Sequence, residues 1–242
     1  MGVTLDAMRA MAQYDRVMVV VAHPDDIEWG MAGTVARLTA AGKQVVYVLA
    51  TRGEAGSEDP ALTVEQVGQL REQEERAAAH HVGVDVVEFL GIPDSQVYYG
   101  PDLRQAIARA MRKHQPQVVI TANYADTWPG GHPNHADHRH VGLATVDAIM
   151  DASLRSAFPE LLAEGLAVWR GCKLLLVAGV ADPTAWVDVT PVIDRAVASL
   201  AAHQSYLAEL KLDADQIARG GSSELGKEHD VGYAEHFRMH SL

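Results

Sequence analysis

The amino-acid sequence predicts an α/β fold in which a mainly parallel sheet is covered by helices on both faces. Short runs of aliphatic and β-branched residues alternate with segments of helical periodicity over most of the length, as in successive strand–helix units. The runs carry few polar residues, which is typical of strands buried on both faces. With 242 residues, 48% of them hydrophobic, the chain is long enough to form one large domain.

A polar loop joins the first predicted strand to the first predicted helix. Residues 16–21 read RVMVVV, and residues 30–41 place apolar side chains at helical spacing before Gly42, a residue type that often ends helices. Because ligands bind beyond the carboxyl ends of strands in an open parallel sheet, titratable groups in this loop indicate a functional site. Four such residues lie there: His23, Asp25, Asp26 and Glu28.

The next part of the chain repeats this pattern. The loop after residue 50 reads TRGEAGSEDP, and the loop after residue 90 contributes Asp94 and Ser95. Several strand ends therefore deliver polar side chains to the same edge of the sheet. Strands are predicted over residues 44–50, 84–90 and 117–122, and helices over residues 63–83 and 102–113.

Arg71 and Glu74 lie three residues apart in the helix predicted over residues 63–83. One interpretation is an exposed ion pair, which contributes only a few tenths of a kcal/mol. The other is that the pair helps to shape the functional site. The sequence favours neither interpretation.

A histidine-rich segment follows the strand predicted over residues 117–122. It reads NYADTWPGGHPNHADHRHVG, and its Pro and Gly residues predict a loop. Ala136 or Asp137 is expected to begin a helix that continues to Met150. The segment therefore gathers four histidines at a helix N-terminus: His132, His135, His138 and His140.

The C-terminal part is less regular. We predict a helical region over residues 153–168 with a break at Pro159, strands over residues 173–179 and 186–189, and one long helix over residues 191–210. Residues 213–242 are polar and contain glycine, and no helix or strand is predicted there.

Composition limits the partners and the compartment. The 20 Lys and Arg residues against 32 Asp and Glu give a formal net charge of -12, which argues against duplex nucleic acid or an anionic membrane as the main partner. Cys172 is the only cysteine, so the chain has no internal disulfide, and no apolar run approaches the roughly 20 residues of a membrane span. Without an apolar signal-peptide core, we expect a cytoplasmic protein.

The two titratable segments together predict a metal site. His23 and Asp26 lie three residues apart across a proline-containing turn, and the segment 131–140 offers a second imidazole. Two histidines and one carboxylate around an open position are the ligand set of many hydrolytic zinc sites. Asp25 would remain as a base for a water whose pKa the ion lowers to about 7. Each segment alone also has a plain interpretation, as an Asx turn or a helix cap.

Six segments of the chain resemble the LmbE-like, or PIG-L, family of zinc-dependent N-deacetylases. They occur in the same order as in that family and span nearly the whole chain, and AHPDD with a downstream H-x-D-H is the most specific pair. The segments are AHPDDIEWGMAGT at 22–34, TRGEAGS at 51–57, FLGIPDS at 89–95, ADHRHVG at 136–142, AHQS at 202–205 and YAEHFR at 233–238.

The resemblance implies a Rossmann-like fold, a single LmbE-like deacetylase domain over residues 1–242, and one divalent metal, zinc or alternatively Fe²⁺. It also implies roles for individual residues. These are His23, Asp26 and His138 as metal ligands, Asp25 as general base, His135 for oxyanion stabilisation or acid catalysis, and Asp137 to orient His135.

The second motif can be aligned in two frames, because the chain contains HPNH at 132–135 and HADH at 135–138. In the first frame His135 would be the ligand and His132 the acid. In the second frame, His138 would be the ligand and His135 the acid. The ADHR-x-x-G continuation favours the second.

The resemblance therefore predicts a deacetylase or amidase that acts on a small N-acyl amine of sugar-like character, with Arg52 and Asp94 as substrate contacts. Family members remove acetyl from N-acetylglucosaminyl groups in thiol-cofactor or glycolipid biosynthesis, or cleave related amides. Two alternatives are a non-catalytic sugar- or nucleotide-binding module, although G-x-G-x-x-G is missing after the first strand, and a two-metal phosphoesterase. The sequence leaves open homo-oligomer formation and the roles of four residues: His132, His140, His203 and Glu235.

Overall fold

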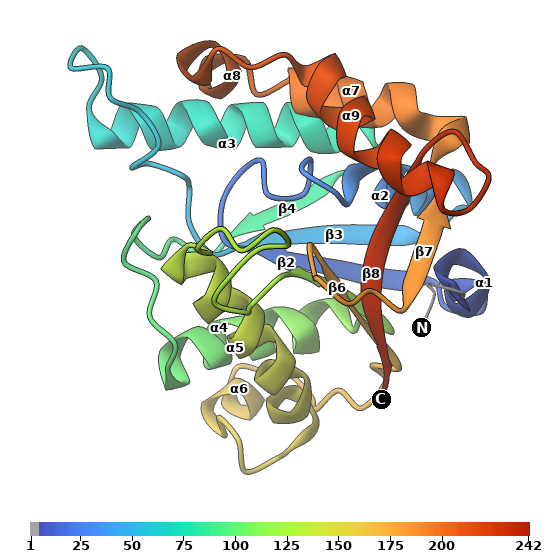
Figure 1. The fold of residues 1–242 in the computed structure, drawn as a ribbon. Coiled ribbons are helices and arrows are strands. Elements are labelled where there is room, and N and C mark those ends of the chain that lie inside the picture. Colours follow the sequence, from blue (N-terminus) through green and yellow to red (C-terminus); the bar gives the residue numbers. More distant parts are fainter. Residues whose placement is uncertain (1–4) are drawn as a thin grey trace.

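Eight strands form one sheet in the computed structural model, which describes residues 5–242 (Figure 1). Their bounds are β1 (Leu5–Asp6), β2 (Arg16–Val21), β3 (Gln44–Leu49), β4 (Val86–Phe89), β5 (Val118–Ala122), β6 (Leu174–Ala178), β7 (Ala185–Asp188) and β8 (Ala234–Ser241). The order across the sheet is β1-β7-β8-β6-β5-β2-β3-β4. Only β8 runs antiparallel to its neighbours, so the predicted mainly parallel sheet is confirmed.

Strand β2 lies at the point where the direction of sheet growth reverses. The chain continues from β2 to β3 and β4 on one side, and then crosses to β5 and β6 on the other side. Both β3 and β5 pair with β2 in parallel, so the three carboxyl ends reach the same edge of the sheet. The loops leaving β2 and β5 diverge there, and this divergence opens the crevice in which α/β proteins bind ligands.

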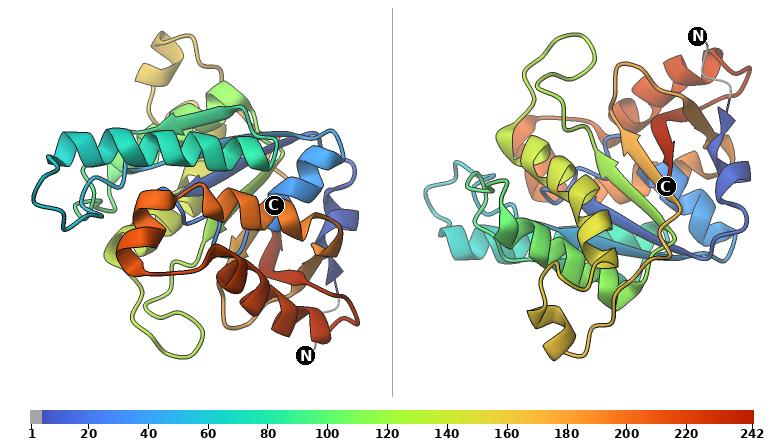
Figure 2. Two further views of the ribbon diagram at one scale, coloured as in Figure 1. Left: turned by 90° about the horizontal axis from the view of Figure 1, so that it is seen from above. Right: turned by 90° about the horizontal axis from the view of Figure 1, so that it is seen from below.

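Helices cover both faces of the sheet (Figures 1 and 2). Helices α2, α3 and α7 contribute to the core on one face, and α4 and α5 contribute to the core on the other. Strand β2 serves both cores, because Val17, Val19 and Val21 point to one face and Met18 and Val20 to the other. The helices are α1 (Ala7–Met11), α2 (Ala32–Ala40), α3 (Val64–His81), α4 (Pro101–His114), α5 (Ala136–Ser153), α6 (Glu160–Ala163), α7 (Ile193–Ala201), α8 (Gln204–Leu210) and α9 (Ala214–Lys227).

Two helix starts that bear on the site follow from side-chain caps. Helix α3 begins after Thr63, which forms a reciprocal capping box with Gln66. Helix α5 begins at Ala136, as predicted, and the imidazole of His135 accepts a hydrogen bond from the backbone N–H of Asp137. Among residues 5–242, the helices lack the combination of length and apolar character that crossing a membrane requires.

The long helix predicted over residues 191–210 is wrong. The segment forms a short 3₁₀ turn (Thr190–Val192) and then α7 and α8, with a break at His203, whose backbone φ and ψ are -79° and 58°. The helical periodicity continues through the break, so the pattern alone gives no sign of it. The break turns the imidazole of His203 into the interior, where it is fully buried.

Two further expectations for the C-terminal part need correction. The region 153–168 contains only one short helix, α6, next to Pro159 and Gly165. The polar tail forms α9 and then β8, which inserts between β6 and β7. Strand β8 was missed because Glu235 is a charged residue at a buried position, and such a residue weakens the strand pattern.

Glu235 explains how β8 is tied to the rest of the fold. Its two carboxylate oxygens accept hydrogen bonds from the backbone N–H groups of Gly33 (2.8 Å) and Thr34 (2.7 Å). These groups belong to the first turn of α2, which has no side-chain cap of its own. A carboxylate is favourable at a helix N-terminus because it satisfies free donors and complements the helix dipole.

We expect Glu235→Ala to lower the free energy of unfolding by about 2–4 kcal/mol, because two buried N–H groups lose their acceptors. Urea unfolding followed by circular dichroism measures the loss. Glu235→Gln keeps one acceptor oxygen and should lose about half as much. An alanine variant as stable as the wild type would contradict this account of how β8 is anchored.

Candidate metal centre

A cavity of about 580 Å³ opens beyond the carboxyl ends of β2 and β5. It is the place where the strand order predicts a ligand crevice. Seven of the titratable residues singled out in the sequence line it: His23, Asp25, Asp26, Arg71, Asp94, His135 and His138.

The loop after β2 is folded by the side chain of Asp26. Its Oδ2 atom accepts hydrogen bonds from the backbone N–H groups of Ala22 (3.0 Å) and His23 (2.9 Å). These two hydrogen bonds close the turn and bring the side chains of His23 and Asp26 to the same side of it. The other oxygen, Oδ1, lies 3.0 Å from Nε2 of His138. The turn and the ligand interpretations of Asp26 are therefore compatible, since each uses a different oxygen.

His138 approaches from the first turn of α5, and a neighbouring amide orients its ring. Nδ1 of His138 lies 3.0 Å from Oδ1 of Asn134. The Nδ2 group of Asn134 donates to the carbonyls of Asn123 (2.8 Å) and Ala125 (3.0 Å), so the amide is fixed with its oxygen toward the ring. Nδ1 of His138 therefore carries the proton, and Nε2 presents its lone pair to the cavity.

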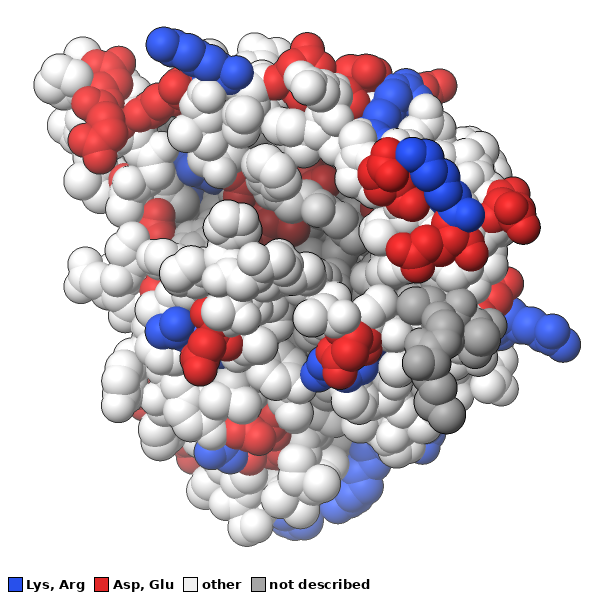
Figure 3. Space-filling model, viewed as in Figure 1, with Lys and Arg blue, Asp and Glu red and all other residues white. Residues whose placement is uncertain are grey.

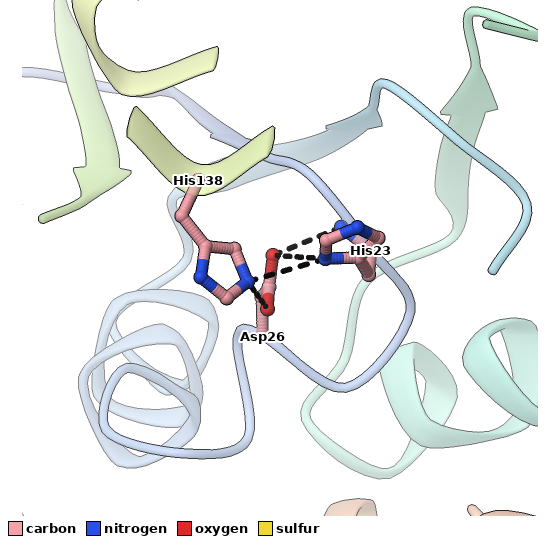
Figure 4. Close-up of side chains that lie close together, drawn as sticks. All are labelled: His23, Asp26 and His138. Carbon is pink, nitrogen blue, oxygen red and sulfur yellow. Dashed lines mark hydrogen bonds and ion pairs between the residues drawn. The ribbon is translucent and has the colours of Figure 1, made fainter. Parts of the chain in front are cut away.

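The three closest donor atoms fit a small divalent cation (Figure 4). His23 Nδ1 and His138 Nε2 are 3.2 Å apart, and each faces an Asp26 oxygen, at 3.7 Å for His23 and 3.0 Å for His138. A tetrahedral ion at about 2.0–2.1 Å from its ligands would hold them about 3.3 Å apart. The separations of 3.2 Å between the two imidazole nitrogens and 3.0 Å from His138 Nε2 to Asp26 Oδ1 lie close to that value, whereas the 3.7 Å separation is to Oδ2, the oxygen that closes the turn. The set of two imidazoles and one carboxylate suits zinc or iron.

The far side of the His23 ring meets two more carboxylates. Nε2 of His23 lies 3.1 Å from Asp94 Oδ1 and 3.3 Å from Asp137 Oδ2. Burial lowers the pKa of His23, but hydrogen bonds to Asp137, Asp26 and Asp94 outweigh that effect and raise the pKa to about 12. Such an excess of carboxylates stabilises positive charge at this point, which is the environment that a divalent cation requires.

Asp25 is buried beside these residues in a strained conformation. Its backbone φ is 92°, outside the regions that residues with a side chain ordinarily adopt. Its Oδ2 atom is 3.2 Å from Nη2 of Arg71, which also donates to the carbonyl of Pro24 (2.6 Å). Burial raises the pKa of Asp25 to about 6, while the charge of Arg71 opposes the rise. Strained residues held by such contacts are common at functional sites.

His135 lines the cavity as an exposed side chain at the start of α5. Its Nδ1 accepts from the backbone N–H of Asp137 (3.4 Å), so its other nitrogen, Nε2, carries the proton of the neutral ring. The carboxylate of Asp137 lies elsewhere, between His23 and the backbone N–H of Ser95, to which it bonds at 2.8 Å. Asp137 thus contacts His135 through its peptide group and His23 through its side chain.

Arg71 belongs to the site, and the alternative of an exposed Arg71–Glu74 ion pair is wrong. Arg71 is buried, pairs with Asp25, and its guanidinium lies 4.5 Å from the centre of the Tyr206 ring. Glu74 is also buried, and it accepts hydrogen bonds from the backbone N–H (2.6 Å) and the hydroxyl (2.8 Å) of Ser205. Only the packing of α3 against α8 could reveal these roles.

Three residues named in the sequence lie away from the cavity lining. Arg52 pairs with Glu65 (2.8 Å) and with Glu72, both on α3. His132 is exposed in the loop before α5, and His140 Nδ1 bonds to the carbonyl of Val97 (2.7 Å). None of the three is among the residues that line the cavity.

Aromatic side chains form walls that the sequence did not predict. Trp29, Trp128 and Tyr206 line the cavity, and Trp29 is half exposed. A second cavity of about 1370 Å³ adjoins the first at Trp29 and Gly179. The sequence feature that could have predicted these walls is the presence of tryptophans in the polar loops at 22–34 and 123–135. A large aromatic side chain in a polar loop after a strand often contacts a ligand.

Comparison with known proteins gives one family match and several similar chains. The model of the family described as PIG-L, GlcNAc-PI de-N-acetylase, matches residues 18–149. The chain is 28% identical over 194 residues to a diacetylchitobiose deacetylase of Thermococcus kodakarensis, covering 80% of this chain and 71% of the relative. It is 32% identical over 232 residues to a 1D-myo-inositol 2-acetamido-2-deoxy-alpha-D-glucopyranoside deacetylase of Mycobacteroides abscessus, covering 79% and 81%.

A solved structure shares the fold over nearly the whole chain. The N,N'-diacetylchitobiose deacetylase from Pyrococcus horikoshii, complexed with an inhibitor, superposes with a TM-score of 0.86 and 24% sequence identity. The match covers 97% of this chain and 87% of the other. This likeness confirms the Rossmann-like fold predicted from the sequence.

The two frames of the histidine motif make different predictions for metal binding. In the second frame we expect His138→Ala to lower the bound metal well below one ion per chain, because one of three ligands is lost. His132→Ala, a change in the same loop region, should keep full occupancy. Metal content is measured by mass spectrometry after dialysis against trace metal. Full occupancy in His138→Ala would reject the second frame.

Proposed function

Because the chain belongs to the PIG-L family of de-N-acetylases, we propose that it is a metal-dependent hydrolase that removes an acetyl group from the amine of a small, sugar-like molecule. The resemblance found in the sequence is thereby confirmed at the level of the family. The main structural support for the proposal is the placement of Asp25 beside His23, Asp26 and His138 in one cavity. The bond cleaved is the C–N bond of a linear amide.

We assign the metal to His23, Asp26 and His138, and zinc is the proposed ion, with Fe²⁺ as the alternative. When bound, the ion would polarise the acetyl carbonyl and lower the pKa of a water at the open coordination position. Asp94 and Asp137 support the site by accepting from Nε2 of His23, which leaves Nδ1 free as a donor atom to the metal.

Asp25 is the proposed general base. It lines the cavity next to the ligand set but is absent from the closest group of donor atoms, so its carboxylate remains available to take a proton from the attacking water. Its contact with Arg71 fixes the carboxylate in one position. A base held in place before the substrate arrives avoids reorganisation during the reaction.

His135 is the proposed acid and oxyanion donor. Its Nδ1 is occupied by the peptide N–H of Asp137, so Nε2–H is the group that it presents to the cavity. That proton can stabilise the negative charge on the acetyl oxygen and then pass to the leaving amine. In this assignment Asp137 orients both histidines, one through its backbone and one through its carboxylate.

The cavities favour a neutral or cationic substrate. Acidic side chains lie inside the hollow on the face seen in Figure 3. A large substrate would extend into the second cavity. Among residues 5–242, Lys211 is the one Lys or Arg that lines it, against five acidic residues: Glu28, Asp182, Asp213, Glu228 and Glu235. Aromatic walls at Trp29, Trp128 and Tyr206 suit the apolar faces of a sugar ring. We propose Asp94, which lines the first cavity, as a substrate contact. We also propose Arg52 as a contact for a substrate that extends beyond the cavity lining.

Two other functions receive less support. A nucleotide-binding module would place phosphates against this acidic surface, which is unfavourable. An amidase acting on a thiol-sugar conjugate needs the same residues as a deacetylase and differs only in the acyl group that it accepts. Acetate release from N-acetyl sugars, compared with hydrolysis of bulkier acyl derivatives, separates the deacetylase from the amidase.

We expect Asp25→Asn to lower kcat by about 10²–10⁴-fold while keeping one metal per chain, because a general base contributes about that much to the rate. Asn tolerates a positive φ as well as Asp does, so the loop should keep its shape. The matched control is Asp126→Asn, at a 96% exposed side chain, which should keep wild-type kcat. An Asp25→Asn protein with full turnover would remove Asp25 from the mechanism.

We expect kcat/KM to be at least about tenfold higher for a neutral N-acetylated disaccharide than for an N-acetylglucosaminyl glycoside with carboxylates on its second moiety. The difference should narrow as the salt concentration rises, because salt screens the repulsion. Steady-state acetate release at low and high salt measures both effects. A preference for the anionic glycoside would contradict the assigned charge selectivity.

A further inference from the structure

A second set of buried titratable residues lies beneath the loop that carries the proposed base. It consists of Glu28, Glu75 and His203, here called the Glu–His cluster, and all three side chains are essentially inaccessible to solvent. Nε2 of His203 lies 3.4 Å from Glu28 Oε2 and 3.7 Å from Glu75 Oε2. The members come from the β2–α2 loop, from α3 and from the break between α7 and α8.

The cluster contacts the backbone of the proposed base at two points, and one of them is the backbone N–H of Glu28, which donates to the carbonyl of Asp25 at 2.9 Å. The N–H group of Asp25 donates to Glu75 Oε2 at 3.2 Å. Asp25 is the residue with φ 92°, a conformation that a side chain disfavours unless surrounding contacts impose it. Glu75 supplies such a contact from below the loop, and Arg71 supplies another through the carbonyl of Pro24.

Glu75 keeps an acceptor oxygen for the N–H of Asp25 in either protonation state, and His203 in the cluster compensates its charge. Burial raises the pKa of Glu75 to about 8. Burial alone would lower the pKa of His203, but its contacts with Glu28 and Glu75 raise that pKa to about 9. The hydroxyl of Ser199 lies 2.7 Å from Glu28 Oε1 and 3.0 Å from the carbonyl oxygen of Ala78, so these two acceptors share its single proton. A protonated His203 thus pairs with both glutamates, whereas a buried glutamate with no partner would be strongly unfavourable.

We propose that Glu75 is a positioning residue for Asp25, and that His203 keeps Glu75 in place beneath the catalytic loop. Glu75 holds the peptide of Asp25 in its left-handed conformation, and that conformation aims the carboxylate into the cavity. The break between α7 and α8 places the imidazole of His203 next to the two glutamates. The link to catalysis rests on the function proposed above, whereas the link to the backbone of Asp25 does not.

The same three residues offer donor atoms within 4.8 Å of one another, so a second metal ion is the competing interpretation. The two interpretations differ in stoichiometry. The positioning role predicts one metal per chain in the wild type and in Glu75 variants. Two ions per chain, falling to one in Glu75→Gln, would overturn the proposal.

The backbone test compares Glu75→Met, Glu75→Gln and a matched control. Amide hydrogen exchange at Asp25, measured by NMR on the full chain, should accelerate at least tenfold more in Glu75→Met than in Glu75→Gln, because the glutamine keeps an acceptor oxygen. The control is Glu235→Met, which removes another fully buried carboxylate that accepts backbone N–H groups, but at α2. It should lower Tm and leave the exchange of Asp25 unchanged relative to its neighbours. Unchanged exchange in Glu75→Met would overturn the proposal.

The kinetic test then asks whether the backbone contact matters for turnover. Glu75→Met should lower kcat at least tenfold at wild-type KM and metal content, and Glu75→Gln should stay within threefold of the wild type. His203→Gln should resemble Glu75→Met in both measurements. A kcat of Glu75→Met within threefold of the wild type, at a temperature where the variant is folded, would overturn the positioning role. Absence of deacetylase activity in the wild type would instead reject the proposed function, and the exchange result would stand.

Discussion

The carboxylate of Asp26 performs two tasks at the carboxyl end of β2, and the rest of the site depends on that division. One oxygen closes the turn on the backbone of Ala22 and His23, and the other faces His138 from α5. Because β2 lies where the strand order reverses, α5 can approach from the β5 side and meet the loop across the crevice. The local turn thus fixes His23 and Asp26, and the strand order of the sheet places His138 next to them.

Asp25 shows how the loop is held in an unfavourable conformation. A residue with a side chain at such a φ costs about 1–3 kcal/mol. A buried N–H group left without an acceptor would cost about 1–3 kcal/mol, so the bond from Asp25 N–H to Glu75 is comparable in size to the strain. Arg71 adds a hydrogen bond to the carbonyl of Pro24 and an ion pair with Asp25. The loop is stabilised from below by a helix that contributes no residue to the proposed ligand set.

The sequence predicted the features whose cause is local, and missed those whose cause is tertiary. The strand–helix alternation from β2 to α5 was predicted because apolar periodicity and helix caps such as Thr63 depend only on residues that are close in the sequence. His23, Asp26 and His138 were named because each stands in a compact motif. Arg71 was left undecided, since only the packing of α3 makes it buried. The break at His203 was missed because its cause, burial against Glu28, lies in a distant segment.

The distribution of roles along the chain suggests how one chemistry can serve different substrates. The family model covers residues 18–149, which contain the proposed ligands, the base and the acid. The later residues supply support and walls: His203 and Glu235 anchor loops from inside, and Tyr206 stacks on Arg71 at the cavity. The second cavity is also lined mainly by residues after 178. Trp29 and Trp128 lie in the same segment as the reacting groups, but Tyr206 and most of the second cavity lie outside it. This part of the walls can therefore change without moving the groups that would act on the amide.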